Sequence, residues 1–139
     1  MQSWLSSILA VAILAGFAAP VRANDFDQVW SCEIRPGQTL EDVRRVSSAW
    51  LRAAKGMAAG DRLQLFVRYP IVVQPSAERF DFVVRAPSLQ DWGAFYDGYH
   101  ADSPVAGVDA EFAAIADCSG SALWESIPVE LDAATRPQQ

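Results

Sequence analysis

Residues 30–43 have the sequence Trp30-Ser31-Cys32-Glu33-Ile34-Arg35-Pro36-Gly37-Gln38-Thr39-Leu40-Glu41-Asp42-Val43. An apolar-rich run leads to Pro36-Gly37, and Thr39 is followed by two acidic residues. Proline lacks the amide hydrogen that a strand ladder needs, and glycine permits a tight turn. Threonine is a favourable N-cap, and negative charge is favoured in the first turn of a helix. This stretch therefore predicts a strand over 29–34, a turn and a helix in succession.

The helix after Thr39 is predicted to be amphipathic, with about five turns, and to end near Gly56 or Gly60. Apolar residues recur there at spacings of three and four. Residues 62–69 then alternate between apolar and polar side chains, which predicts a strand, and residues 71–73 are expected to continue it beyond a kink. Residues 80–85 alternate as well, so a hairpin that turns at 74–78 is expected.

The second half of the mature chain repeats this order. Ser88 with Asp91 three residues later resembles a capping box and predicts a helix that stops near His100. A further short helix is expected over 108–116, followed by a turn at 117–120. Residues 121–131 alternate as a last strand, and residues 24–28 are expected to be mobile.

The predicted order of strands and helices indicates an α+β fold of the ferredoxin-like βαββαβ type. It predicts a four-stranded antiparallel sheet with two main helices on one face. Phe66, Val83 and Trp124 then lie on the opposite face, among charged side chains. Such a half-apolar face is either a dimer interface or the wall of a ligand pocket. Two sheets packed face to face would make a dimeric α+β barrel.

The N-terminus predicts export. A short apolar run precedes Ala23 with small or apolar residues at the cleavage positions, so residues 1–23 are expected to be a signal peptide. An uncleaved membrane anchor is the alternative, although the run is short for a bilayer span. Residues 24–131 are expected to form a single domain and residues 132–139 a disordered tail. The expected location is periplasmic or secreted, with no membrane contact after cleavage.

Cys32 and Cys118 are the two cysteines, and in an exported domain an even count suggests a disulfide. Two buried thiols are the alternative. A metal site is not expected, because these cysteines and the single histidine lack ligand spacing. The net charge of the full chain is −6, and it becomes about −7 once the leader, which contains Arg22, is cleaved off. Such a surface disfavours nucleic acid as a partner. No phosphate loop or nucleophile motif occurs, so no cofactor is expected.

Residues 32–43, together with Asp117-Cys118-Ser119, resemble a group of small exported bacterial proteins of unassigned function. Their plan is similar to the dimeric α+β barrel superfamily. That superfamily includes quinone-forming monooxygenases, haem-handling enzymes and binding proteins, so the resemblance implies a fold and a homodimer without fixing an activity.

His100 is the only histidine, and Asp97 precedes it by three residues. On a helix these two would share a face and could act as an acid/base pair, with Tyr99 as a further candidate catalytic residue. The alternative is a histidine that only interacts with the carbonyl groups at a helix end.

Two other sets of residues are candidate ligand-binding groups. Trp92 and Tyr96 could line an apolar pocket between helix and sheet, or could simply be core residues. Arg68 and Arg85 could bind an anionic ligand on the open sheet face, or could be solvated or paired with Asp81.

Three functions follow from the sequence. The first is non-enzymatic binding of a small apolar or aromatic ligand, or of a protein partner, on the sheet face. The second is a cofactor-free enzyme that resembles the monooxygenases. The third is a purely structural homodimer. The sequence leaves open whether the protein is an enzyme.

Overall fold

The fold is a four-stranded antiparallel sheet covered by helices, as seen in a computed structural model that describes residues 24–72 and 78–127. The predicted leader, most of the predicted hairpin turn and the predicted tail lie outside these residues. The elements are β1 (Asp25–Ile34), α1 (Leu40–Lys55), a 3-10 turn η1 (Gly60–Arg62), β2 (Gln64–Arg68), β3 (Arg79–Ala86), α2 (Leu89–Asp97), α3 (Pro104–Ile115) and β4 (Ala116–Ser126). The strand order β2-β3-β1-β4 confirms the predicted ferredoxin-like fold.

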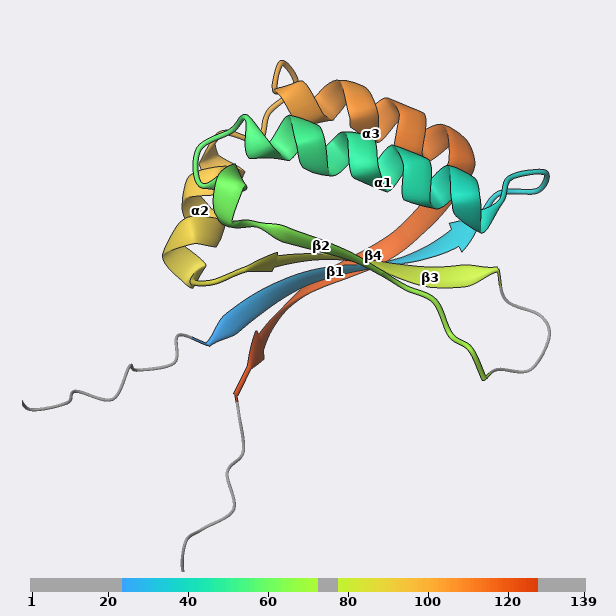
Figure 1. Ribbon diagram of the computed structural model, residues 1–139, viewed down its shortest axis with the longest axis horizontal. Helices are drawn as coiled ribbons and strands as arrows, with labels where there is room; N and C mark the ends of the chain where they lie inside the picture. The colour runs from blue at the N-terminus through green and yellow to red at the C-terminus, as the bar shows by residue number, and fades with distance from the viewer. Residues whose placement is uncertain (1–23, 73–77, 128–139) are drawn as a thin grey trace, which may run out of the picture.

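The helices lie on one face of the sheet. Figure 1 shows α1 and α3 side by side above the strands, with α2 at one end of this layer. No helix of the described residues covers the opposite face. The hydrophobic core therefore lies between the α1–α3 layer and the inward side chains of β1, β2 and β3.

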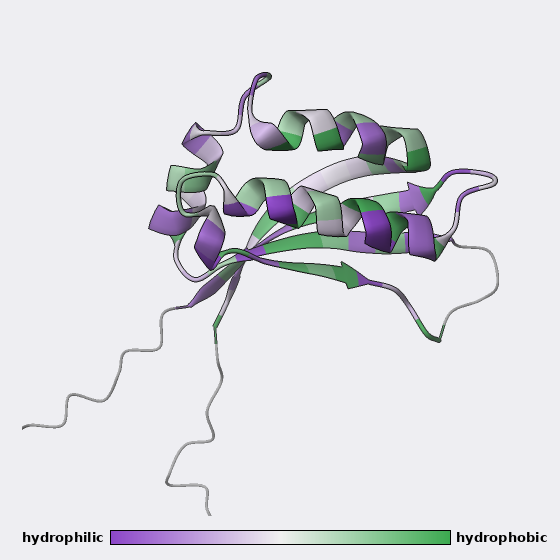
Figure 2. Ribbon diagram, turned by 45° about the horizontal axis from the view of Figure 1, so that its top comes forward, coloured by the Kyte–Doolittle hydropathy of each residue, from purple (hydrophilic) through white to green (hydrophobic). Residues whose placement is uncertain are grey.

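The sequence prediction assigned the second main helix to the wrong segment. The helix beside α1 is α3, with twelve residues, whereas α2 has only nine. Pro104 stands at the start of α3, where its missing amide hydrogen costs nothing. Figure 2 shows hydrophilic segments recurring along α1, while α3 is mainly pale or green. Because α3 is apolar around most of its circumference, its sequence lacks the stripe that marked the other helices.

The start of α1 agrees with its prediction. The Thr39 hydroxyl accepts from the Asp42 amide, and the Asp42 carboxylate accepts from the Thr39 amide, so both halves of a capping box form. The helix ends at Gly56, and its buried side chains Val43, Val46 and Trp50 face the sheet.

Two strand predictions were wrong at their ends. Residues 25–28, expected to be mobile, pair with β3 and β4 as the first part of β1. Ile71 and Val72, expected to continue β2, are 94% and 90% exposed and belong to no strand. Pro70 removes a ladder donor just before them, and β2 ends at Arg68.

The predicted turn at 117–120 is instead part of β4. Trp30 pairs with Ser121 and Ser31 with Ser119, so Gly120 is an extra residue in the ladder. Its φ of +74° is in the left-handed region that favours glycine. The bulge shifts the alternation of side chains, and Trp124 therefore lies opposite Asp27 on the open face of the sheet.

Candidate functional site

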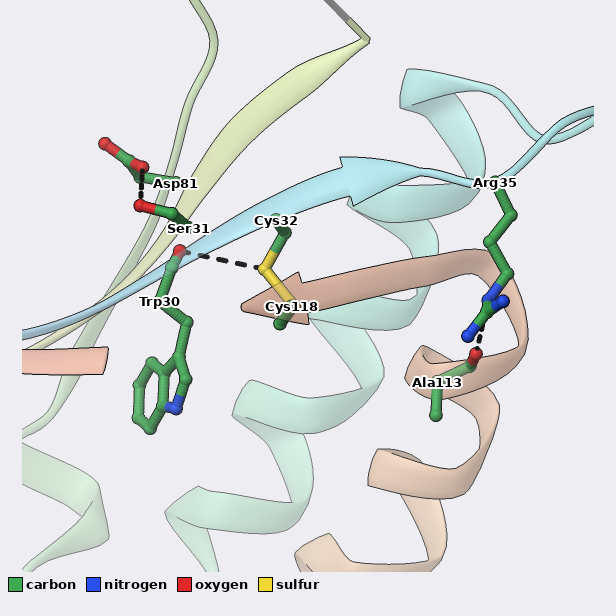
Figure 3. The surroundings of a disulfide bond; sticks show 7 residues. All are labelled: Trp30, Ser31, Cys32, Arg35, Asp81, Ala113 and Cys118. Carbon is green, nitrogen blue, oxygen red and sulfur yellow. Dashed lines mark hydrogen bonds between the residues drawn. A yellow bond between two sulfur atoms is a disulfide. The ribbon is translucent and has the colours of Figure 1, made fainter. Parts of the chain in front are cut away.

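A disulfide joins the central strand β1 to the edge strand β4. Cys32 on β1 and Cys118 on β4 are directly paired in the ladder, with 4.0 Å between their Cα atoms. Figure 3 shows the bond on the helix side of the sheet, with the Trp30 indole on the same side and Ser31 turned away. The structure thus contains the disulfide that the cysteine count predicts.

Beside this disulfide lies a cavity of about 430 Å³ between the sheet and the helices. Aromatic side chains form most of its wall. The strands and α1 provide Trp30, Phe82 and Trp50. The remaining rings come from the α2 region and α3: Trp92, Phe95, Tyr96, Tyr99 and Phe112. The wall is therefore assembled from segments far apart in the sequence.

The rings contact one another in edge-on and tilted arrangements. The Phe82 ring lies 5.4 Å from the Trp50 ring and 4.9 Å from the Phe112 ring, both in T-shaped arrangements. Trp92 and Tyr96 lie 5.7 Å apart on α2. Such pairs contribute about 0.5–1.5 kcal/mol each beyond the burial of their area. The floor of the cavity is therefore a packed and largely pre-formed surface.

Two acidic residues line the cavity, Asp117 on β4 and Asp109 on α3, and Asp109 lies among the rings. Asp109, on α3, is partly buried and accepts a hydrogen bond from the Trp50 indole nitrogen at 2.9 Å. Its second oxygen accepts from the Tyr99 hydroxyl. Burial first, and then this hydrogen bond, raise the pKa of Tyr99 above its usual range. Tyr99 therefore stays protonated and acts as a donor to Asp109.

A guanidinium lies at the rim of the same cavity. The Arg35 side chain donates from Nε to the carbonyl oxygen of Ala113 at 2.9 Å, near the C-terminal end of α3. Figure 3 shows this contact beyond the disulfide, at the end of β1. Cations are favoured at helix C-termini because the terminal carbonyl groups carry partial negative charge.

The structure separates the residues that the sequence singled out. Trp92, Tyr96 and Tyr99 all line the cavity. Asp97 and His100 are exposed and do not line it. Helix α2 ends at Asp97, so His100 is not on the same helical face as the sequence argument assumed. The described residues include no hydrogen bond or salt bridge between these two side chains.

Arg68 and Arg85 lie on the opposite, open face of the sheet. Both donate to Asp27, which is only 4% exposed: Arg85 Nε and Nη2 at 2.7 and 2.8 Å, and Arg68 Nη2 at 2.9 Å. Arg85 also stacks over the Phe66 ring at 5.1 Å. Asp81, the partner expected from the sequence, instead accepts from Ser31.

The hydrogen bonds from Arg85 lower the pKa of Asp27, with Arg68 adding to the effect against the opposing cost of burial. Asp27 is therefore an ionised carboxylate whose charge the protein itself neutralises. Sequence reasoning missed both Asp27 and Asp109. Asp27 was assigned to a mobile segment, and Asp109 had no partner nearby in the sequence.

Within residues 24–72 and 78–127, no group of three or more His, Cys, Asp or Glu side chains is placed to hold a metal ion. No helix in the same residues is long and apolar enough to cross a bilayer.

No protein-family model matches the chain, and no curated protein sequence shows significant similarity to it. Among solved structures, it is similar to a dimeric protein of unknown function and ferredoxin-like fold from Bacteroides fragilis. The two are 12% identical with a TM-score of 0.45, over 73% of this chain and 96% of that chain. The fold assignment here rests on the observed strand order.

Proposed function

We propose that the protein is an exported domain that binds a small apolar or aromatic molecule in the cavity between helices and sheet. The folded domain would extend over residues 24–131 after removal of residues 1–23. A disulfide is typical of proteins that work outside the cytoplasm, which supports export. The aromatic wall beside this disulfide is the observation that carries the binding proposal.

The size and chemistry of the cavity suit a ligand of this class. Pockets for small molecules usually measure roughly 300–1,000 Å³, with apolar walls and a few polar groups that fix orientation. The observed cavity of about 430 Å³ has this composition, with Tyr99 and Asp109 as polar groups. Binding is favoured over cofactor-free catalysis, because the candidate pair Asp97 and His100 lies outside the cavity.

Blocking the cavity tests this proposal. Ala113 and its neighbour Ala114 are both exposed, but only Ala113 lines the cavity. We expect the neutral fluorescent probe N-phenyl-1-naphthylamine to bind the wild-type protein at one site. Ala113→Phe should weaken this binding at least tenfold, because the new ring occupies the cavity. Ala114→Phe is the matched control and should leave the affinity unchanged. Equal affinity of both variants for the probe would refute the proposal that the probe binds in this cavity.

We also propose that the open sheet face contacts a second copy of the chain. Trp124 on this face is 60% exposed, and Phe66 is 38% exposed. The side chains of Arg68 and Asp25 are about half exposed, so the face offers charges of both signs. A two-fold axis brings the same patch of each copy together, so positive side chains of one copy can lie against negative side chains of the other.

The native mass in solution tests this second proposal. We expect a dimer by light scattering, and we expect Trp124→Glu to yield a folded monomer because it buries an unpaired charge in the contact. Leu123→Glu, at the neighbouring β4 position on the other face, is the control. A wild-type monomer at high concentration would refute the dimer without affecting the cavity proposal.

A further inference from the structure

Asp109 is a carboxylate without a cationic partner in the part of the chain that the structure describes: the salt bridges found there involve other acidic residues. Both of its hydrogen-bond donors, Trp50 and Tyr99, are neutral groups. A carboxylate has about four lone-pair sites, so these two donors leave acceptor capacity free. A partly buried charge among aromatic rings costs free energy unless it is paired.

The other charged residues around the cavity do not supply this partner. Arg35 is engaged with the carbonyl of Ala113, four residues after Asp109 and about 6 Å further along the helix. Asp117 also lines the cavity but is itself acidic, and it lies on β4, opposite Glu33 in the backbone ladder, where it borders a second hollow lined by Arg79 and Arg68. The charge presented by the α2–α3 end of the cavity is therefore the negative charge of Asp109.

We propose that the ligand of this cavity is an organic cation, an ammonium group on an apolar or aromatic body, and that Asp109 is its counter-ion. This inference rests on the proposed function and specifies its ligand class. The ammonium would donate charge-assisted hydrogen bonds to the free lone pairs of Asp109, and these are stronger than neutral ones. The surrounding rings add cation–π attraction, which is stronger when the cation is desolvated.

The surroundings of Asp109 fit this role. Trp50 and Tyr99 hold the two oxygens in a fixed orientation, so the carboxylate need not be reorganised when a ligand arrives. Trp50 is itself fixed by contacts with Phe82 and Phe95. The net charge of −6 for the whole chain also favours the approach of cations.

Three probes with one ring and different charges test the inference: tryptamine, tryptophol and indole-3-acetate, which are cationic, neutral and anionic at neutral pH. Their affinities for the disulfide-bonded protein are measured by isothermal titration calorimetry. We expect tryptamine to bind at least tenfold more tightly than tryptophol, and indole-3-acetate to bind most weakly. Asp109→Asn should abolish the preference for tryptamine and leave the affinity for tryptophol within about twofold.

Glu111→Gln is the matched control, because it removes the same charge from an exposed position on the same helix. It should leave the preference intact. Equal affinities of the wild-type protein for tryptamine and tryptophol would overturn the inference and leave the binding proposal standing. Tightest binding of indole-3-acetate would overturn it in favour of Arg35. If none of the probes binds, both the cation site and the proposed function fail.

Discussion

Removal of the disulfide should destabilise the protein by an amount that follows from its sequence separation. Cys32 and Cys118 are 86 residues apart. In the chain-entropy model, a cross-link that closes a loop of this length lowers the entropy of the unfolded chain enough to stabilise the fold by roughly 4–5 kcal/mol. The variant Cys32→Ala/Cys118→Ala removes the bond without leaving a reactive thiol.

The position of the bond adds a local effect. Ala116 is the only described residue of β4 that is buried, so this strand is held by its ladder with β1 and by the disulfide more than by packing. Elements with few buried contacts open at low free energy. We therefore expect faster amide hydrogen exchange along β4 in the double variant, together with weaker probe binding, since β4 borders the cavity.

Urea unfolding of the oxidised protein and of the variant measures the global effect. Ser31→Ala/Ser119→Ala is the matched control, because it changes the neighbouring cross-strand pair, which has no covalent link. We expect the control to cost less than about 1 kcal/mol, as surface substitutions usually do. The entropic argument would be refuted if the cysteine variant lost no more free energy of unfolding than the control, with the slope of that free energy against urea concentration unchanged.

Three further perturbations test the core, the open face and one close approach. Trp50→Ala should cost about 3–5 kcal/mol, because the ring is 4% exposed; a near-wild-type melting curve would contradict this. Asp27→Asn should cost about 1–3 kcal/mol at neutral pH, because the carboxylate's charge-assisted hydrogen bonds from Arg85 and Arg68 are lost. Because the pKa of Asp27 is lowered in the folded state, its contribution is complete above about pH 4 and is lost as the pH falls through the lowered value. Urea unfolding from pH 6 to pH 2 should therefore show a smaller loss of stability in Asp27→Asn than in the wild type. Gly60→Ala should destabilise by about 1–3 kcal/mol, because the new Cβ would lie 1.8 Å from a backbone oxygen of Ala54. In Gly107→Ala the new Cβ on α3 would have no atom within contact distance, so this variant should stabilise the fold by about 0.5–1 kcal/mol. A stability change of the same sign in both glycine variants would contradict the packing argument.

The parts of the fold that the sequence predicts are those with local signals. The capping box at Thr39 and the alternation in β3 depend on residues only a few positions apart, so a single sequence contains the whole signal. The position of α3 beside α1 depends on packing between distant segments. The bulge at Gly120 depends on its pairing with β1, and its glycine by itself predicted a turn.

The same distinction explains the candidate site. Trp92, Tyr96 and Tyr99 were found because their helical spacing indicates a shared face, and they do line one cavity. Asp27 and Asp109 were missed because their partners are remote. Arg85 is 58 residues from Asp27, and Trp50 is 59 residues from Asp109. Nothing in the neighbouring sequence marks either carboxylate as a group with a partner.

These two carboxylates differ in how the protein balances their charge. Asp27 is the more deeply buried, and two guanidinium groups neutralise it inside the protein, so it needs nothing from outside. Within the part of the chain that the structure describes, Asp109 accepts side-chain hydrogen bonds from an indole and a phenol, which orient the carboxylate but leave its charge in place. A protein that needed Asp109 only for structure would lose little with an uncharged acceptor at that position. This unneutralised charge at the aromatic wall is the observation that supports the proposed cationic ligand.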